Sequence, residues 1–285
     1  MSVMEPSHWL TPGWSEGEPG HNGPPGTVTL VGAGPGDPEL LTIKAMRALQ
    51  AAKLVLYDHL VSPGVLDYLP PDADRVYVGK ESSHHTLPQA SIIELMIRLA
   101  KSGRPVLRLK GGDGYIFGRG GEEAQALVAA GVPFTVVPGL TAAQGAAASV
   151  GIPLTHRDHA CSLVLATGHM RENRQLDMDW EMLARPRQTL VLYMGVNNLP
   201  EICAQLIAHG LPDTTPAALV ERATQPEERC ITGTLADLPA LAKQHGVKPP
   251  ALIMVGAVVA LRTELMPAAE KRIATPPMPL EAIST

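Results

Sequence analysis

A glycine-rich turn at 110–121 is the first candidate for chemistry in this chain of 285 residues. Its sequence, Lys-Gly-Gly-Asp-Gly-Tyr-Ile-Phe-Gly-Arg-Gly-Gly, follows a predicted strand, where open α/β sheets place their sites, and its glycines let the backbone approach a ligand closely. Asp113 can accept hydrogen bonds from a hydroxyl or an ammonium group of that ligand. Arg119 stands between glycines, which favours a ligand role for its guanidinium. Glu122 and Glu123 fall in the first turn of the next helix, where capping alone explains them.

A second glycine-rich turn, Gly-Ala-Gly-Pro-Gly-Asp at 32–37, lies between the first predicted strand and the first predicted helix, where α/β proteins bind phosphates. The dinucleotide fingerprint requires glycine at its first, third and sixth positions, but Asp37 occupies the sixth. Asp58, at the end of the second strand, stands where an acid would bind a ribose. A nicotinamide-dependent oxidoreductase therefore stays open as an alternative.

Two further turns add small and cationic residues. Val-Pro-Gly-Leu-Thr-Ala-Ala at 137–143 leaves room for a flat ligand and offers the hydroxyl of Thr141, and Ile-Pro-Leu-Thr-His-Arg at 152–157 brings a second arginine. The histidines at 156, 159 and 169 lack a ligand spacing such as HExxH, so no metal is predicted. Serine and cysteine nucleophiles are not favoured, because no Gly-x-Ser-x-Gly occurs and Cys161, although close to His159, adjoins an apolar strand, where a structural thiol is the commoner case.

The composition argues against several further classes of function. The formal net charge is −5 and aromatic residues make up 4% of the chain, which does not fit a protein that covers nucleic-acid phosphates. The longest apolar stretch, 251–261, is too short for a membrane span, and the first residues lack the apolar segment of a signal peptide. We therefore expect a cytoplasmic protein with no nucleic-acid and no membrane partner.

Short apolar runs alternate with helical patterns and define the elements that must position these turns. Strands are expected at 27–31, 53–57, 75–78, 105–109 and 134–137; helices are expected after the turn at 32–37, from Leu40 onward, and at 88–102, 119–130 and 141–150. A second set has strands at 162–167, 189–193, 217–220, 229–232 and 251–255 and helices at 199–209 and 235–245. The alternation in the first set predicts right-handed βαβ units and a largely parallel sheet, and the two sets together predict an α/β fold.

The predicted organisation has four parts. Residues 1–26 are rich in proline and glycine and are expected to form a disordered lead, and residues 267–285 a disordered tail. Between them we expect an N-terminal α/β domain at 27–139 and a C-terminal α/β domain at 140–266, with a hinge near 138–141.

Seven motifs occur in one order along the chain. They are Val-Gly-Ala-Gly-Pro-Gly-Asp-Pro at 31–38, Tyr-Asp-His-Leu-Val-Ser at 57–62, Val-Gly-Lys at 78–80, Arg-Leu-Lys-Gly-Gly-Asp at 108–113, Ile-Phe-Gly-Arg-Gly-Gly-Glu-Glu at 116–123, Val-Pro-Gly-Leu-Thr-Ala at 137–142 and Gly-Ile-Pro-Leu-Thr-His-Arg at 151–157. The series resembles the tetrapyrrole methylases, and within them the uroporphyrinogen-III C-methyltransferases. The resemblance covers about 27–262 and is to the monofunctional type, because no second enzymatic domain precedes it. One departure is Gly114, where the family usually has proline.

The resemblance implies two α/β domains with a cleft between them, a homodimer, and S-adenosylmethionine as the cofactor, released as S-adenosylhomocysteine. The residues implied around the cofactor are Pro35, Gly111, Gly112, Asp113, Ile116, Thr141, Ala142, Met194 and Ala223. The residues implied around the substrate, uroporphyrinogen III, are His59, Arg119, Glu122, Arg157, His169 and Met194, with Arg171 or Arg174 as further candidates. This substrate carries eight carboxylates, so a chain of negative net charge must meet it with local arginines.

The implied reaction is methylation of uroporphyrinogen III at C2 and C7, which gives precorrin-2 for sirohaem, cobalamin or haem d1 synthesis. By resemblance, Asp58 accepts a proton and Lys80 donates one; Arg119 is a competing candidate, although a guanidinium is a poor base. A later precorrin methylase and a non-catalytic tetrapyrrole carrier also stay open.

Overall fold

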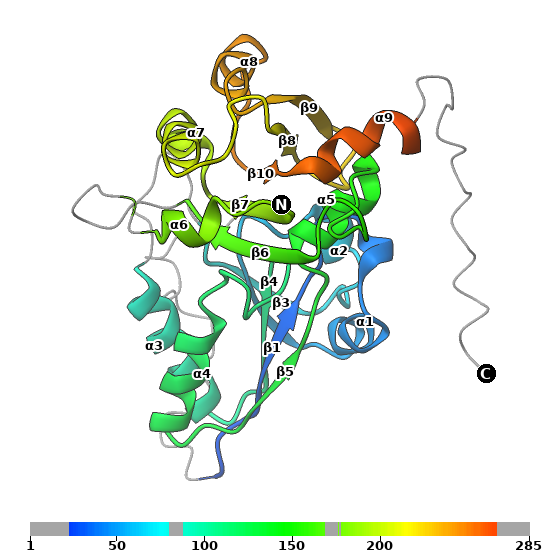
Figure 1. Ribbon diagram of the computed structural model, residues 1–285. Coiled ribbons are helices and arrows are strands. Elements are labelled where there is room, and N and C mark those ends of the chain that lie inside the picture. Colours follow the sequence, from blue (N-terminus) through cyan, green and yellow to red (C-terminus); the bar gives the residue numbers. More distant parts are fainter. Residues whose placement is uncertain (1–22, 80–87, 169–175, 177, 267–285) are drawn as a thin grey trace.

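The computed structural model describes residues 23–79, 88–168, 176 and 178–266. In these ranges the chain forms two five-stranded sheets with helices packed against them, one sheet from each half of the sequence (Figure 1). The predicted α/β fold is therefore confirmed. Lys80 and His169, the predicted tail at 267–285 and all but residues 23–26 of the predicted lead lie outside the described residues.

The first sheet is parallel in every pairing and has the order β3-β2-β4-β1-β5. Its strands are β1 (Val28–Gly32), β2 (Leu54–Tyr57), β3 (Asp74–Tyr77), β4 (Val106–Lys110) and β5 (Phe134–Val137). All five carboxyl ends therefore lie along one edge of the sheet, so the turns that follow the strands are brought together there.

Helices cover both faces of this sheet, as expected for βαβ units. The helices α1 (Ile43–Gln50) and α2 (Pro63–Leu66) pack on one face, in an apolar cluster that includes Leu49 and Val55. The helices α3 (Gln89–Lys101) and α4 (Gly120–Ala129) pack on the other face, in a cluster that includes Leu56 and Leu127. Figure 1 shows α3 and α4 on one side of the sheet and α1 on the other.

The second sheet is mixed, unlike the first sheet, for which the sequence predicted largely parallel pairing. Its order is β6-β7-β10-β8-β9, and of its four pairings only that of β6 with β7 is parallel. A short turn at 222–228 joins β8 to β9, which permits an antiparallel hairpin and is too short for a parallel crossover. The strands are β6 (Ser162–Thr167), β7 (Gln188–Tyr193), β8 (Pro216–Glu221), β9 (Arg229–Thr234) and β10 (Ala251–Val255).

The helices of the second half also lie on both faces of their sheet. The alanine-rich helix α5 (Ala142–Val150) packs on one face together with η4 (Ala257–Leu261), and α6 (Trp180–Leu183), α7 (Leu199–Ala208) and α8 (Leu238–Gln244) pack on the other. A last helix, α9 (Arg262–Leu265), follows η4, and a 3-10 turn, η3 (Val196–Asn198), precedes α7. Within the ranges that the structure describes, no helix has the length and apolar character needed to cross a membrane.

The first helix begins later than the sequence pattern suggested. Leu40 belongs to a 3-10 turn, η2 (Pro38–Leu40), and α1 starts only at Ile43. Two side-chain caps explain this boundary: Asp37 accepts a hydrogen bond from the N–H of Glu39 at 2.9 Å, and Thr42 Oγ1 accepts one from the N–H of Ala45 at 3.1 Å. The turn after β1 therefore does not lead directly into an α-helix, as a dinucleotide-binding turn would.

Candidate active site

Three strand ends of the first sheet meet through their glycine backbones. Gly34 and Gly112, which follow β1 and β4, exchange two hydrogen bonds of 3.1 and 2.7 Å. A Cβ at Gly32 would lie 2.5 Å from the nitrogen of Gly139, after β5, and 2.7 Å from the oxygen of Gly112. Real Cβ atoms do not approach that closely, so any side chain at Gly32 would push these turns apart.

Asp113 fixes the geometry of this junction. Its Oδ1 accepts a hydrogen bond from the N–H of Tyr115 at 2.8 Å, and its Oδ2 accepts one from the N–H of Gly139 at 3.1 Å. Each oxygen keeps a lone pair for a ligand. The adjacent Gly112 has a φ of 66°, and a Cβ there would contact only the nitrogen of Ala142, at 3.7 Å. The turn therefore presents bare backbone to open space beside the start of α5.

Tyr193, at the end of β7, connects the second sheet to this junction through hydrogen bonds. Its hydroxyl lies 2.5 Å from Thr141 Oγ1 and accepts a hydrogen bond from the N–H of Ala143 at 3.0 Å. Its ring packs against that of Phe117 with centroids 4.9 Å apart. Burial raises the pKa of Tyr193, so the phenol stays neutral at physiological pH. Sequence reasoning missed both aromatic residues, although Tyr193 directly precedes the predicted Met194.

Strained backbone marks the two turns that the second half contributes. Met194, Arg222 and Thr224 have φ values of 54°, 47° and 66°, a region that non-glycine residues rarely adopt. Thr224 Oγ1 accepts a hydrogen bond from the N–H of Asp37 at 3.0 Å, which joins the turn after β8 to the turn after β1. The turns connected in this way carry all the residues predicted for the cofactor: Pro35, Gly111, Gly112, Asp113, Ile116, Thr141, Ala142, Met194 and Ala223.

A buried ion cluster lies beside this junction, between β4 and α4. Arg108, Lys110 and Glu123 are 2%, 3% and 0% exposed. Glu123 Oε1 accepts hydrogen bonds from Arg108 Nε at 3.2 Å and from Lys110 Nζ at 3.1 Å. Burial, and then the nearby Arg108 charge, lower the pKa of Lys110. Sequence reasoning missed this cluster; its signal was a pair of charges two residues apart in an apolar strand, which places both on one face.

Asp58 connects the buried ion cluster to the surface. Its Oδ2 lies 3.3 Å from Arg108 Nη2, its Oδ1 accepts a hydrogen bond from the N–H of Leu60 at 3.2 Å, and its side chain is 24% exposed. His59 is exposed, and the backbone of Gly79 lies against the nitrogen of His59. The predicted proton donor, Lys80, follows Gly79 directly but lies outside the described residues.

Arg119 and Glu122 form a separate, exposed ion pair at the start of α4. Two hydrogen bonds join them, from Arg119 Nε at 2.9 Å and Nη2 at 2.7 Å, and both side chains are about half exposed. The hydrogen bond from Arg119 lowers the pKa of Glu122, and the same bond raises the pKa of Arg119. The guanidinium therefore stays charged, which suits anion binding and argues against Arg119 as a base.

The glycines beside Arg119 have a packing role that the sequence pattern did not indicate. A Cβ at Gly118 would lie 2.7 Å from the oxygen of Gly114, and one at Gly120 would lie 2.5 Å from the same oxygen. Both glycines are thus required by the fold of the turn itself, independently of any room for the Arg119 guanidinium.

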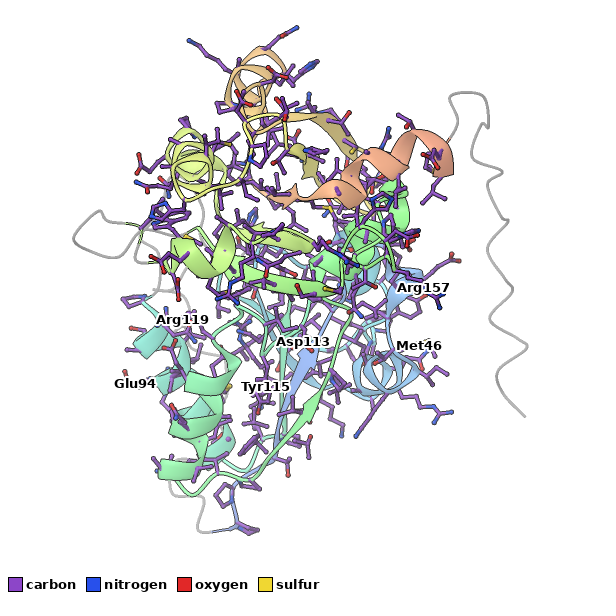
Figure 2. All side chains as sticks on the ribbon, viewed as in Figure 1. Met46, Glu94, Asp113, Tyr115, Arg119 and Arg157 are labelled. Atoms are coloured by element: carbon purple, nitrogen blue, oxygen red, sulfur yellow. The ribbon has the colours of Figure 1, made fainter. Side chains whose placement is uncertain are left out.

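The remaining predicted substrate residues are scattered or outside the described ranges. Arg157 is exposed, in the turn that the 156–160 bridge closes, and its carbonyl oxygen accepts a hydrogen bond from Arg187 at 3.1 Å. Figure 2 shows Arg119 and Arg157 on opposite sides of the view, so the structure does not place these two arginines side by side. His169, Arg171 and Arg174 are not among the described residues.

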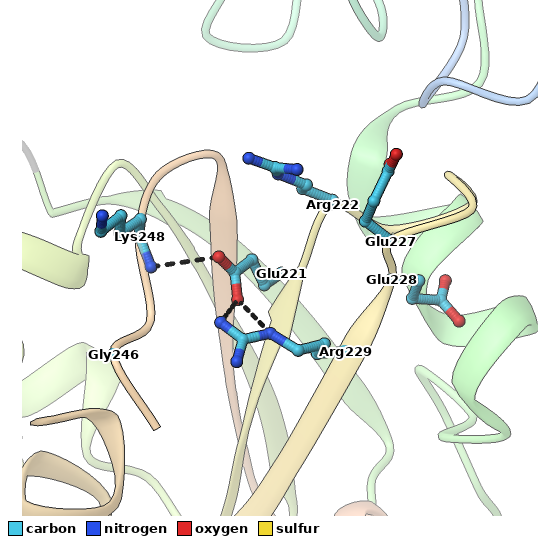
Figure 3. A pocket seen from close by; sticks show the side chains of 7 residues that line it. All are labelled: Glu221, Arg222, Glu227, Glu228, Arg229, Gly246 and Lys248. Carbon is cyan, nitrogen blue, oxygen red and sulfur yellow. Dashed lines mark hydrogen bonds and ion pairs between the residues drawn. The ribbon is translucent and has the colours of Figure 1, made fainter. Parts of the chain in front are cut away.

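A pocket lies at the carboxyl end of β8, beside the turn at 222–228 (Figure 3). Glu221 is buried there; its Oε2 accepts a hydrogen bond from Arg229 Nε at 2.8 Å, and its Oε1 accepts one from the N–H of Lys248 at 3.3 Å. The pocket carries as many acidic as basic side chains and none of the predicted site residues. Its lining residues are Glu221, Arg222, Glu227, Glu228, Arg229, Gly246 and Lys248.

The structure gives little support to other chemistries. Burial raises the pKa of the Cys203 thiol to about 12, so it cannot supply a thiolate nucleophile. In the part of the chain that the structure describes, no three His, Cys, Asp or Glu side chains are grouped to hold a metal ion. Asp37 uses its carboxylate and its N–H within its own turn and the turn after β8, where a dinucleotide-binding protein has glycine.

Comparison with known sequences identifies relatives over most of the chain. Residues 27–239 match the family of tetrapyrrole (corrin/porphyrin) methylases. The siroheme synthase of Nitrosomonas europaea is 58% identical over 242 residues, which are 85% of this chain and 51% of that protein. The siroheme synthase of Gluconacetobacter diazotrophicus is 56% identical over 252 residues, 88% of this chain and 52% of that protein. This chain therefore spans about half the length of the curated relatives it matches.

Solved structures agree with this assignment. A uroporphyrin-III C-methyltransferase from Thermus thermophilus, complexed with S-adenyl homocysteine, is 42% identical and superposes with a TM-score of 0.71 over 83% of this chain and 94% of that one. A cobalt precorrin-4 methyltransferase is 27% identical, with a TM-score of 0.72 over 82% of this chain and 95% of that one. The predicted resemblance is confirmed, and the match over 27–239 shows that the chain belongs to the tetrapyrrole methylase family.

Proposed function

We propose that this chain transfers methyl groups from S-adenosylmethionine to C2 and C7 of uroporphyrinogen III and so forms precorrin-2. The observation that carries the proposal is that the Gly111-Gly112-Asp113 turn, which can hold a cofactor, lies close to the carboxylate of Asp58. A Cβ at Gly111 would lie 2.5 Å from Leu60 Cβ, so the Gly-Gly-Asp turn packs directly against the loop that begins with Asp58. A ligand held at Gly112 thus has an acid–base group close by.

The junction of turns fits S-adenosylmethionine, which supplies an electrophilic methyl group when it is bound. Gly112 presents backbone to open space next to Ala142, and small side chains there leave room for an adenosine. Asp113, held rigidly by two backbone N–H groups, suits a ribose hydroxyl or an amino group. A relative of known structure carries the demethylated product of this cofactor. We assign the nine junction residues, including Ile116 and Met194, to cofactor binding.

Arg119 is the group we assign to the substrate carboxylates. Uroporphyrinogen III carries eight of them, and this chain has a formal net charge of −5, so local cations must attract it. The exposed guanidinium of Arg119 can form bidentate hydrogen bonds to a carboxylate. Glu122 can then turn to a pyrrole N–H, and exposed Met194 offers apolar contact at the same turns. His59, Arg157 and His169 stay candidates for the rest of the macrocycle.

Asp58 is the group we assign to proton removal. Attack by an electron-rich pyrrole carbon leaves the substrate with an extra positive charge, which is lost with a proton. Asp58 is partly exposed and lies 3.3 Å from Arg108, so a substrate can reach a carboxylate that the ion pair holds in place. Lys80 is the corresponding candidate for proton donation. Arg119 is less suited to this role, because its hydrogen bonds to Glu122 raise its pKa and the guanidinium stays protonated.

The place of the product in metabolism and the assembly of the protein belong to the same proposal. The curated relatives are siroheme synthases, which favours sirohaem over cobalamin or haem d1 as the destination of precorrin-2. A homodimer in the cytoplasm is the arrangement we propose for the active protein. The domain boundary near 138–141 fits the point where β5 ends and α5 begins.

An anaerobic assay with S-adenosylmethionine and uroporphyrinogen III tests the function. We expect the macrocycle to gain the mass of two methyl groups as two equivalents of S-adenosylhomocysteine are released. A later precorrin methylase, suggested by the likeness to the cobalt precorrin-4 enzyme, would leave this macrocycle unchanged but methylate a corrinoid precursor. A tetrapyrrole carrier would bind the macrocycle and consume no methyl donor.

A further inference from the structure

Arg108 links the interior of the first sheet to the carboxylate of Asp58. It is 2% exposed, and each of its three nitrogens has a partner. Nε contacts Glu123 Oε1 at 3.2 Å, Nη1 donates to the carbonyl of Leu109 at 3.0 Å, and Nη2 contacts Asp58 Oδ2 at 3.3 Å. Because the Asp58 side chain is 24% exposed, a buried cation here holds a carboxylate that a substrate can reach.

Glu123 in turn holds Arg108. Three donors converge on its Oε1: Arg108 Nε, Lys110 Nζ at 3.1 Å and Gln89 Nε2 at 3.0 Å. Its Oε2 has no hydrogen-bond partner among the described residues, although Glu123 is fully buried. A buried carboxylate with this arrangement is retained at a cost in stability, which points to a role beyond packing.

We propose that Arg108 is a positioning residue for proton removal, that it acts through Asp58, and that Glu123 keeps Arg108 in place. The inference rests on the proposed function, because it requires Asp58 to take a proton from the methylated substrate. The charged groups that the structure describes around Asp58 are Arg108 and Lys110 of β4 and Glu123 of α4, with His59 next in the chain. Two cations and two carboxylates give the cluster no net charge while Asp58 is ionised.

The proton balance shows what the cluster does. When the methylated pyrrole system releases a proton, the electron pair of the broken bond returns to the ring and the extra positive charge is lost. Asp58 takes that proton and becomes a neutral acid, so the cluster now carries one net positive charge. Asp58 then gives the proton to solvent, which restores its ion pair with Arg108. Arg108 thus resets the base after each of the two methylations.

The test removes the positive charge of Arg108 in one variant and the negative charge of its partner Glu123 in another. The measurement is kcat against pH, anaerobically, with both substrates saturating, in Arg108→Gln and Glu123→Gln. Loss of the cation should move the acidic limb of the profile to higher pH by about one unit and lower kcat at neutral pH by about tenfold or more. Loss of the buried carboxylate should move the same limb to lower pH. Arg108→Lys, which keeps the charge, should return the limb toward the wild-type position.

Three controls separate the possible failures. Arg104→Gln breaks an ion pair with Asp74 at the opposite edge of the first sheet, where β3 and β4 begin, and should leave the profile unchanged. Thermal unfolding and S-adenosylmethionine binding identify a variant that has not folded. If Arg108→Gln fails in this way, the Glu123→Gln variant still tests the proposal.

If the wild type is active and the folded variants keep the wild-type position of the acidic limb, this inference alone is overturned. A wild type that transfers no methyl group to uroporphyrinogen III overturns the proposed function, and this inference with it.

Discussion

Two adjacent glutamates of α4 take part in ion clusters of opposite character. Glu122 is 51% exposed and pairs with Arg119 in solvent, whereas Glu123 is fully buried and pairs with Arg108 and Lys110. Successive residues of a helix point about 100° apart, so the first turn of α4 faces the solvent and the sheet at once. Residue type alone therefore does not determine what a charged pair does here.

The difference in burial determines which pair can exchange partners. An exposed ion pair contributes little to stability, so Arg119 can leave Glu122 for a substrate carboxylate at small cost. A buried pair cannot be opened in this way, because each separated charge would stay without water. We therefore assign binding to the exposed pair and the support of Asp58 to the buried ion cluster.

Truncation of the two glutamates should give the largest contrast. Glu123→Ala leaves Arg108 and Lys110 buried without their carboxylate and should lower the free energy of unfolding by about 3–5 kcal/mol. Glu122→Ala, at the preceding position of the same helix, should change it by less than about 1 kcal/mol. Urea unfolding followed by circular dichroism measures both. Equal losses in the two variants would contradict the division into a buried and an exposed cluster.

Removal of Arg119 should separate activity from stability. Arg119→Ala is expected to reduce turnover of uroporphyrinogen III by about 100-fold, equivalent to about 2.7 kcal/mol, because the substrate carboxylates lose a bidentate partner. Affinity for S-adenosylmethionine, measured by calorimetry, and the unfolding midpoint should stay at wild-type values. Arg98→Ala, on the exposed side of α3, is the matched control. Full activity in Arg119→Ala would remove this residue from the site.

The first sheet could be predicted from the sequence, because its strands, turns and helices follow one another directly along the chain. Parallel strands followed by glycine-rich turns place Asp58 and Asp113 at one sheet edge by topology alone, and the structure agrees. The order of the second sheet depends on which distant strands pair, and apolar runs of similar length do not encode that choice. Its mixed pairing was therefore missed, although the short turn between β8 and β9 already indicated a hairpin.

The buried ion cluster shows a second limit of sequence reasoning. Glu123 was interpreted as a capping acid, because the sequence indicates that it lies in the first turn of a helix but not that its side chain faces the sheet. Arg108 and Lys110 carried a usable signal, since charges at alternate positions of an apolar strand share one face and require a partner there. Tyr193 gave a weaker signal, because only the tertiary contact of β7 with α5 places its hydroxyl beside Thr141.

The titration of Lys110 should sharpen the contrast further. Burial is the main cause that lowers the pKa of Lys110 in the folded protein below 10.5. At pH values below this lowered pKa, the charged side chain reduces the free energy of unfolding. This penalty disappears as the pH rises toward 10.5. Wild type should therefore gain stability relative to Lys110→Met as pH increases, by at most about 1.4 kcal/mol per pH unit. Urea unfolding at a series of pH values measures this. The exposed Lys44, changed in the same way, should show no such trend.

Gly114 lies between the two clusters and should give the smallest effect. A Cβ there would lie 3.4 Å from Lys110 Cδ, an ordinary contact, whereas the Gly114 oxygen is the atom that Gly118 and Gly120 approach. Gly114→Ala should therefore raise the free energy of unfolding by about 0.4–1 kcal/mol, because the unfolded chain loses freedom and the folded turn accepts the methyl group. Gly118→Ala, whose Cβ would lie 2.7 Å from that oxygen, should lower it instead. The same sign for both would mean that the turn relaxes freely and that its glycines do not fix where Arg119 stands.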